Sequence, residues 1–372
     1  MGRPVSWTVA LSDLRVSDRQ RAAVSDVLDS GWLSMGPRTA SFESAFAESA
    51  AVGHAVAVSS GTAGLLLALQ AAGVAPGDEV ILPSLTFVAD ANVVRSLGAT
   101  PVFADIEAAD RPLVDPTSIL DKVTRRTRAA IVVHYGGALA QVEPLLGHEF
   151  AVIEDAAHAV GPIADNSPWL QLRGDVAVFS FFANKNLALG EGGMIATNSG
   201  ELDASLRRLR AHGMTSTTWD RHQGHASDYD VVTIGTNARI TEIQAAMGEA
   251  GLPDLPTNNA KRRQLLRRYA ELLEGSPVSL ALHDVASSGH LAVAVLPVTG
   301  QRPRIRSALA DAGIQTSFHY PPIHRFTAYA GCAAAPLPAT EAAEQRLMTL
   351  PLHPYLTDDA IELVVSVLLD SL

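Results

Sequence analysis

The sequence predicts a doubly wound α/β domain with a mostly parallel sheet, followed by a smaller α+β domain. Up to about residue 245, short runs that are apolar throughout alternate with longer amphipathic stretches. Strands that are apolar along their whole length are typical of a parallel sheet with helices on both faces. The chain has 372 residues, 47% of them hydrophobic and 18% charged, which is enough for two well-packed domains.

Seven apolar runs are expected to form the strands of the large sheet. They span residues 54–60, 78–84, 100–106, 128–137, 150–157, 175–182 and 192–198. Helix-like segments such as 61–73 and 86–98 separate them, as crossovers between parallel strands require.

The C-terminal part has a different pattern. Residues 260–275 form a basic amphipathic helix, while 290–298 and 314–320 look like strands. Thr357 is the expected N-cap of a terminal helix, because acidic residues follow it in the first turn. We therefore predict a large domain of residues 1–245, which includes the N-terminal segment, and a small domain of residues 246–372.

Charge and composition exclude several classes of function. The net charge of -11 disfavours binding to nucleic acid or to an anionic membrane. The single cysteine, Cys332, rules out an internal disulfide and a cysteine-based metal site. The N-terminus lacks the apolar core of a secretory signal, and no run of about 20 apolar residues is present. We expect a soluble, cytoplasmic protein that binds no metal.

One lysine stands out in a chain that uses arginine almost everywhere. Of 28 basic residues only Lys122, Lys185 and Lys261 are lysines, and Lys185 lies between an apolar run and the glycine cluster "GEGG". A lone lysine is usually a solvated surface charge. Lys185, however, follows a predicted strand, and ligands of open parallel sheets bind beyond the carboxyl ends of the strands.

Three further features fall at predicted strand ends, and each also has an ordinary structural explanation. "SSGTAG" (59–64) offers free N–H groups at a helix N-terminus to an anion, although it also suits a simple N-cap. Asp155 ends an apolar strand, where it would need a cationic partner, an N-cap role or a buried salt bridge. Phe87 could stack on a planar ligand or fill the core. Pyridoxal phosphate needs an amine, an anion site, a carboxylate and a stacking ring together, so the joint pattern predicts this cofactor.

The chain resembles the DegT/DnrJ/StrS family of pyridoxal-phosphate aminotransferases, which act on nucleotide-linked keto-sugars and related keto-cyclitols. The resemblance runs nearly end to end. It rests on "GWLSMGP" (31–37), "FESAFAE" (42–48), "AVSSGTAGLLLAL" (57–69), "PSLTFVADAN" (83–92), "PVFADI" (101–106), "VIEDAAHAVG" (152–161), "FSFFANKNLALGEGGMIATN" (179–198), "GTNARITEIQAAMG" (235–248), "FHYPPIH" (318–324) and "LPLHP" (350–354).

The resemblance implies the fold of the aspartate-aminotransferase type (fold type I) and a role for each matching residue. Lys185 would form the internal aldimine, and Asp155 would face the pyridine nitrogen. The other implied cofactor contacts are His158 near the phenolic oxygen, Gly61, Thr62 and Ser180 at the phosphate, and Phe87 as the stacking ring. Asn237 would reach the phosphate from the neighbouring subunit, which implies a homodimer. His319, Tyr320 and His324 would line the substrate side.

The resemblance also implies the reaction. An amino-acid donor, L-glutamate in most of the family, would leave its amino group on the cofactor as pyridoxamine phosphate, which would then aminate a keto-sugar. A thymidine-diphosphate-linked (dTDP) keto-deoxysugar of secondary or antibiotic metabolism is the first expectation for the acceptor, and a keto-cyclitol is the second. Arginine could not replace Lys185, because a guanidinium stays protonated.

Other interpretations predict other residues. A pyridoxal-phosphate lyase or desulfurase would keep Lys185 and Asp155, but a desulfurase needs a mobile catalytic cysteine, and Cys332 is poorly placed for that role. A regulator would need a DNA-binding segment, which the acidic charge disfavours. The polar loop 214–230 contains two histidines but no metal-binding HExxH pattern. We expect this loop to cover the site, with Arg221 contacting the substrate.

Overall fold

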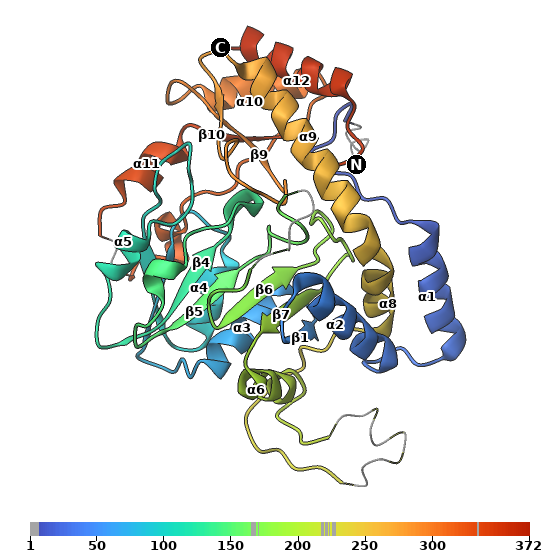
Figure 1. Ribbon diagram of the computed structural model, residues 1–372. Coiled ribbons are helices and arrows are strands. Elements are labelled where there is room, and N and C mark those ends of the chain that lie inside the picture. The colour runs from blue at the N-terminus through green and yellow to red at the C-terminus, as the bar shows by residue number, and fades with distance from the viewer. Residues whose placement is uncertain are drawn as a thin grey trace.

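The computed structural model describes residues 7–164, 169, 171–216, 219, 222, 224, 228–332 and 335–372. In these residues a large mixed sheet lies between helices, and a smaller sheet with its own helices packs beside it (Figure 1). No helix in the described ranges has both the length and the apolar character that crossing a bilayer requires.

The large sheet has seven strands in the order β1-β7-β6-β5-β4-β2-β3. Neighbouring strands from β6 to β3 are parallel, whereas β7 is antiparallel to both β1 and β6. The strands are β1 (His54–Val58), β2 (Glu79–Pro83), β3 (Thr100–Ala104), β4 (Thr127–Val133), β5 (Ala151–Asp155), β6 (Val176–Ser180) and β7 (Gly193–Thr197). Each of the seven predicted runs coincides with one strand to within one residue at its start, so the predicted mostly parallel sheet is confirmed.

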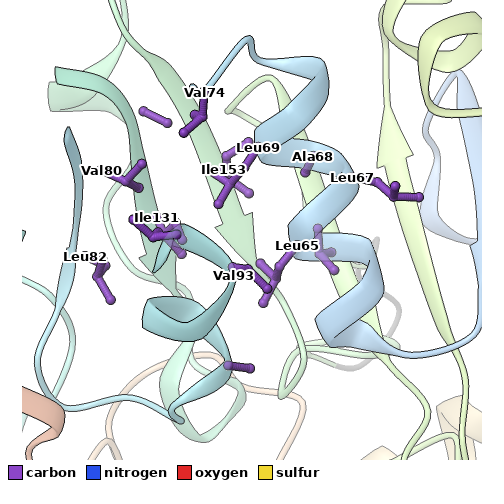
Figure 2. Packing of buried hydrophobic residues seen from close by; sticks show 14 of the residues in the cluster. Leu65, Leu67, Ala68, Leu69, Val74, Val80, Leu82, Val93, Ile131 and Ile153 are labelled. Carbon is purple, nitrogen blue, oxygen red and sulfur yellow. The ribbon is translucent and has the colours of Figure 1, made fainter. Parts of the chain in front are cut away.

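Helices cover both faces of this sheet, which explains why its strands are apolar throughout. On one face lie α3 (Gly61–Ala71), α4 (Ala89–Ser96) and α6 (Gly200–Arg210). Figure 2 shows Leu69 of α3 beside Ile153 of β5, and Leu65 of α3 beside Val93 of α4. The opposite face of β1, β6 and β7 packs on α2 (Pro37–Ala50), whose Phe42 and Phe46 are fully buried there.

The smaller sheet is antiparallel and lies in the C-terminal part of the chain. Its order is β10-β9-β8, with β8 (Ser279–Leu280), β9 (Ala292–Val295) and β10 (Leu347–Leu350). The helices α9 (Leu255–Leu273), α10 (Arg302–Asp311) and α12 (Asp358–Asp370) share its hydrophobic core. Thr357 caps α12 as predicted, because its side chain accepts a hydrogen bond from the N–H of Ala360.

The predicted strand at 314–320 is wrong. This segment makes only isolated bridges, at Ile314 and Ser317, and then runs toward the large sheet. Pro321 and Pro322 follow it, and proline has no N–H to extend a ladder. The short strand β8 and the strand β10 were not predicted from the sequence.

Four further helices complete the described structure. They are α1 (Asp18–Ser30), α5 (Pro116–Leu120), α8 (Glu242–Gly251) and α11 (Pro338–Glu344), with single 3₁₀ turns at 135–137, 143–145, 252–254, 323–325 and 327–329. The predicted domain boundary between residues 245 and 246 falls inside α8. The N-terminal segment bonds to the C-terminal part, where the N–H of Gln315 donates to the carbonyl of Val9. The two-domain division therefore remains a proposal.

Candidate active site

A cavity of about 390 Å³ opens where the parallel strands of the large sheet end. Its walls come from the ends of β4, β5 and β6, the start of α3, the segments that follow β2 and β6, and one segment of the C-terminal part. The lining residues are Ser60, Gly61, Thr62, Leu65, Thr86, Phe87, Ala89, Val133, Asp155, Ala157, His158, Ser180, Phe182, Asn184, Lys185, Glu191, His319 and Tyr320. This is the edge at which open α/β sheets bind ligands.

Lys185 places in this cavity an amine that can lose its proton near neutral pH. It follows β6 in a tight turn, in which its backbone N–H donates to the carbonyl of Phe182 at 2.9 Å. Burial lowers the pKa of Lys185 from 10.5 to about 8, and the nearby Asp155 carboxylate opposes that shift. An amine with a pKa of about 8 is neutral in roughly one molecule in ten at pH 7, so it is available as a nucleophile and a base.

Asp155 is the last residue of β5 and is 8% exposed. The N–H of Ala157 donates to its Oδ1 at 2.9 Å. Burial raises the pKa of Asp155, while the hydrogen bond from Ala157 and the positive charge of Lys185 act in the opposite direction. The carboxyl is thus held in the cavity with limited solvation, where a cationic ligand atom would stabilise its charged form.

His158 is held as a neutral imidazole. The N–H of Gly136 donates to its Nδ1 at 3.2 Å, so the ring proton is on Nε2, which lies 3.0 Å from the hydroxyl of Tyr320. Burial lowers the pKa of His158 well below 6.5, and Lys185 adds to this effect. His158 therefore offers an N–H donor and not a charge.

The start of α3 provides an anion-binding position beside Ser180. Ser60 caps the helix by accepting the N–H of Ala63 at 3.1 Å, and the helix N-terminus directs further N–H groups outward. A Cβ on Gly61 would lie 3.0 Å from the Cβ of Ser180. Glycine is therefore favoured here, because the start of the helix passes close to the end of β6.

Two aromatic rings remain exposed at this cavity. Phe87 is 53% and Phe182 is 45% exposed, although both are large apolar side chains. The ring centroid of Phe87 lies 5.7 Å from that of Tyr320. An aromatic ring with an open face beside a cavity suits stacking on a planar ligand.

Nine of the predicted site residues line this cavity, and two others that the structure describes, Asn237 and His324, do not. Asn237 is exposed and pairs through its backbone with Ala211 outside the cavity. His324 also lies outside, where its Nδ1 is 2.6 Å from the hydroxyl of Ser84. In the single chain His324 is not among the residues that line the cavity, so its predicted role on the substrate side remains a prediction. Arg221 lies outside the described residues.

Sequence reasoning missed several members of the site. Thr86, Asn184 and Glu191 line the cavity, and the buried Asp90 contacts its wall through Thr86. His290 packs on His158 with 4.4 Å between ring centroids. Thr86 and Asp90 are four residues apart after β2, and that spacing in "LTFVAD" could have indicated a paired Thr and Asp.

The residues present fit pyridoxal phosphate. The cavity offers an amine for the aldehyde, a helix N-terminus for the phosphate, a carboxyl for the ring nitrogen and exposed aromatic rings for the ring face. The neutral His158 adds a hydrogen-bond donor that suits an oxyanion. Fold and site together are those expected of a pyridoxal-phosphate enzyme.

Residues 15–369 match the sequence profile of the DegT/DnrJ/EryC1/StrS aminotransferase family, and the chain belongs to this family. The chain is 38% identical to the spore coat polysaccharide biosynthesis protein SpsC of Bacillus subtilis (strain 168), with 93% of this chain and 92% of SpsC covered. The protein is therefore an aminotransferase, as the resemblance implied.

Solved structures agree with this assignment. The chain is similar to DesI in the presence of its TDP-sugar product, at 32% identity and a TM-score of 0.86, with 98% of this chain and 93% of DesI covered. It is also similar to the PLP form of Spr1654 from Streptococcus pneumoniae, at 28% identity and a TM-score of 0.88, with 100% and 98% covered.

Proposed function

We propose that this protein is a pyridoxal-phosphate-dependent aminotransferase that moves an amino group from L-glutamate to a keto group of a dTDP-linked keto-deoxysugar. The observation that carries the proposal is the buried amine of Lys185, with its lowered pKa, in one cavity with Asp155 and a helix N-terminus. The TDP-sugar product of DesI and the polysaccharide pathway of SpsC support a nucleotide-linked sugar as the acceptor.

The cofactor, when bound, supplies a carbonyl that condenses with amines and a protonated ring that withdraws electrons. Lys185 would hold it through Nζ, and the α3 N-terminus with Ser180 would bind its phosphate. Asp155 would keep the ring nitrogen protonated by offering it a carboxylate in a poorly solvated site. His158 would donate from Nε2 to the ring oxygen, exchanging its present contact with Tyr320.

Once its amine is free, Lys185 is suited to carry a proton. Its lowered pKa means that Nζ can take a proton from a substrate carbon and return it to another atom nearby. His319 adds no competing charge, because burial lowers its pKa to about 4. The cavity therefore contains one amine that titrates near neutral pH, next to imidazoles that stay neutral.

The cofactor assignment can be tested by trapping. The purified protein is mixed with pyridoxal phosphate, reduced with borohydride and digested, and the modified lysine is located by mass spectrometry. We expect the label on Lys185 and little on Lys122 or Lys261. Lys185→Ala and Lys185→Arg should lose both the label and the visible absorption band. A label spread over all three lysines would contradict the proposal.

The donor and acceptor require a second experiment. Adding L-glutamate to the loaded enzyme should convert the absorption band and release one 2-oxoglutarate for each site, whereas D-glutamate should do neither. The aminated enzyme is then offered a dTDP-4-keto-deoxysugar or a keto-cyclitol, and the products are analysed by mass spectrometry. Amination of the cyclitol alone would overturn the sugar assignment and leave the aminotransferase assignment intact.

We further propose a homodimer in which Asn237 of each chain completes the phosphate site of its neighbour. The exposed position of Asn237 outside the cavity of its own chain supports this arrangement. Lys185→Ala and Asn237→Ala should each lack activity alone. Mixing them under conditions that exchange subunits should restore activity, because one site of each mixed dimer is native. No recovery between two inactive, dimeric variants would exclude the arrangement.

A further inference from the structure

Asp90 is a second buried carboxyl behind the cavity wall. It lies in the first turn of α4 and is 0% exposed. The hydroxyl of Thr86 donates to its Oδ2 at 2.5 Å. Its other oxygen, Oδ1, is buried and has no N–H or O–H donor among the described residues. A buried carboxylate oxygen without a donor is costly, so this atom needs an explanation.

Besides Thr86, the carboxyl of Asp155 lies within hydrogen-bonding reach of the Asp90 carboxyl. Two ionised carboxylates cannot bond to one another, because both have only acceptor atoms. One shared proton removes the repulsion and turns the contact into a charge-assisted hydrogen bond. Two buried carboxyls in contact, one of them with an oxygen that has no donor, therefore require a proton between them.

The surroundings decide which carboxyl carries this proton. Asp155 accepts the N–H of Ala157 and lies near the positive charge of Lys185, and both stabilise its anion. Among the described residues, the hydroxyl of Thr86 is the one hydrogen-bond donor to Asp90. Besides Asp155, the titratable groups near Asp90 are the phenols of Tyr320 and Tyr329. Burial and the charge of Asp155 raise the pKa of Asp90 well above its usual value.

We propose that Asp90 is a positioning residue that stays protonated at neutral pH and donates a hydrogen bond from its carboxyl to Asp155. Its effect on the cofactor rests on the proposed function, in which Asp155 faces the ring nitrogen. Asp90 holds the Asp155 carboxyl in one orientation and stabilises its anion without adding a second negative charge. The Thr86 hydroxyl in turn fixes the Asp90 carboxyl from the other side.

The proton can be observed without any cofactor. Infrared spectra of the cofactor-free protein, compared with and without ¹³C-aspartate, should contain the carbonyl stretch of a protonated carboxylic acid at pH 7. Asp90→Asn should remove this band, and Asp155→Asn should retain it, because Asp90 then donates to the amide oxygen. Absence of the band in the native protein, or its loss only in Asp155→Asn, would overturn the proposal.

The positioning role is tested by a matched pair of substitutions. Asp90→Asn keeps an N–H donor toward Asp155, whereas Asp90→Leu has similar bulk and no donor. We expect Asp90→Asn to bind pyridoxal phosphate nearly as the native protein does. Asp90→Leu should bind it about 10- to 100-fold more weakly, the range for losing a hydrogen bond to a charged group. Equal weakening by both would refute a role for the donor.

The two experiments separate this inference from the proposed function. If the infrared band belongs to Asp90 but the protein binds no pyridoxal phosphate, the shared proton stands and the cofactor assignment fails. If the cofactor binds to Lys185 but the native protein lacks the band, the aminotransferase assignment stands and the role of Asp90 fails.

Discussion

Lys185 should react with acylating reagents at a pH where ordinary lysines do not. Burial lowers its pKa from 10.5 to about 8, and only the neutral amine is nucleophilic. At pH 7 an amine with the usual pKa is neutral in about three molecules in ten thousand, against about one in ten for Lys185. The neutral fraction is therefore larger by about 300-fold.

The assay is trace acetylation of the cofactor-free protein, followed by digestion and mass spectrometry of the lysine peptides. The chain contains only three lysines, so Lys122 and Lys261 report reaction outside the cavity in the same sample. From about pH 6 to about pH 10, labelling of Lys185 should rise with a midpoint near 8. A midpoint near 10.5 would refute the buried amine.

Asp155 provides the matched test of the cause. Its carboxylate acts against the effect of burial and raises the pKa of Lys185. In Asp155→Asn the labelling midpoint should therefore move to lower pH. A midpoint that moves to higher pH would mean that the Asp155 charge does not act on Lys185 as the structure indicates.

Three further predictions concern stability. Glu43→Ala should cost about 3–5 kcal/mol in urea unfolding, because it leaves the buried Arg210 without its carboxylate partner, whereas Glu43→Gln should cost less. Glu242→Ala should cost about 3 kcal/mol or more in the same assay, since this buried side chain accepts three backbone N–H groups and one hydroxyl near the start of α2. The cofactor-free protein should lose stability as the pH falls below about 6.5, because the native state keeps His158 and His290 neutral while the unfolded chain binds protons at both. Replacing both by Asn should make the free energy of unfolding fall less steeply with decreasing pH. An unchanged pH dependence would contradict the lowered pKa values of the two histidines.

The large sheet was predictable from the sequence for a physical reason. Strands covered on both faces must be apolar along their length, and each of the seven runs is also short enough to be a strand. The second sheet was less predictable. β8 has two residues and β10 has four, so neither carries a repeating pattern. Residues 314–320 look like a strand by composition, but tertiary contacts draw them to the cavity.

The candidate site was predictable where a residue lies at a strand end or a helix start. Lys185, Asp155 and Gly61 lie at such positions, and it was their combination with Phe87 that indicated the site. The contacts of Asp90 with Asp155 and of His290 with His158 could not be predicted, because these partners are distant in sequence. Asn237 and His324 match sequence blocks of the family, but the single chain brings neither to the cavity.

The cavity is closed by a segment made late in synthesis. His319 and Tyr320 line it from the C-terminal part of the chain, and Tyr320 bonds there to His158. Tyr135, beside β4, donates its hydroxyl proton to the carbonyl of His319. A nascent chain that ends before these two residues has the amine, the carboxyl and the helix N-terminus but lacks one wall. The wall of the cavity is therefore complete only when residues 319 and 320, far along the chain from Lys185, have packed against β4 and β5.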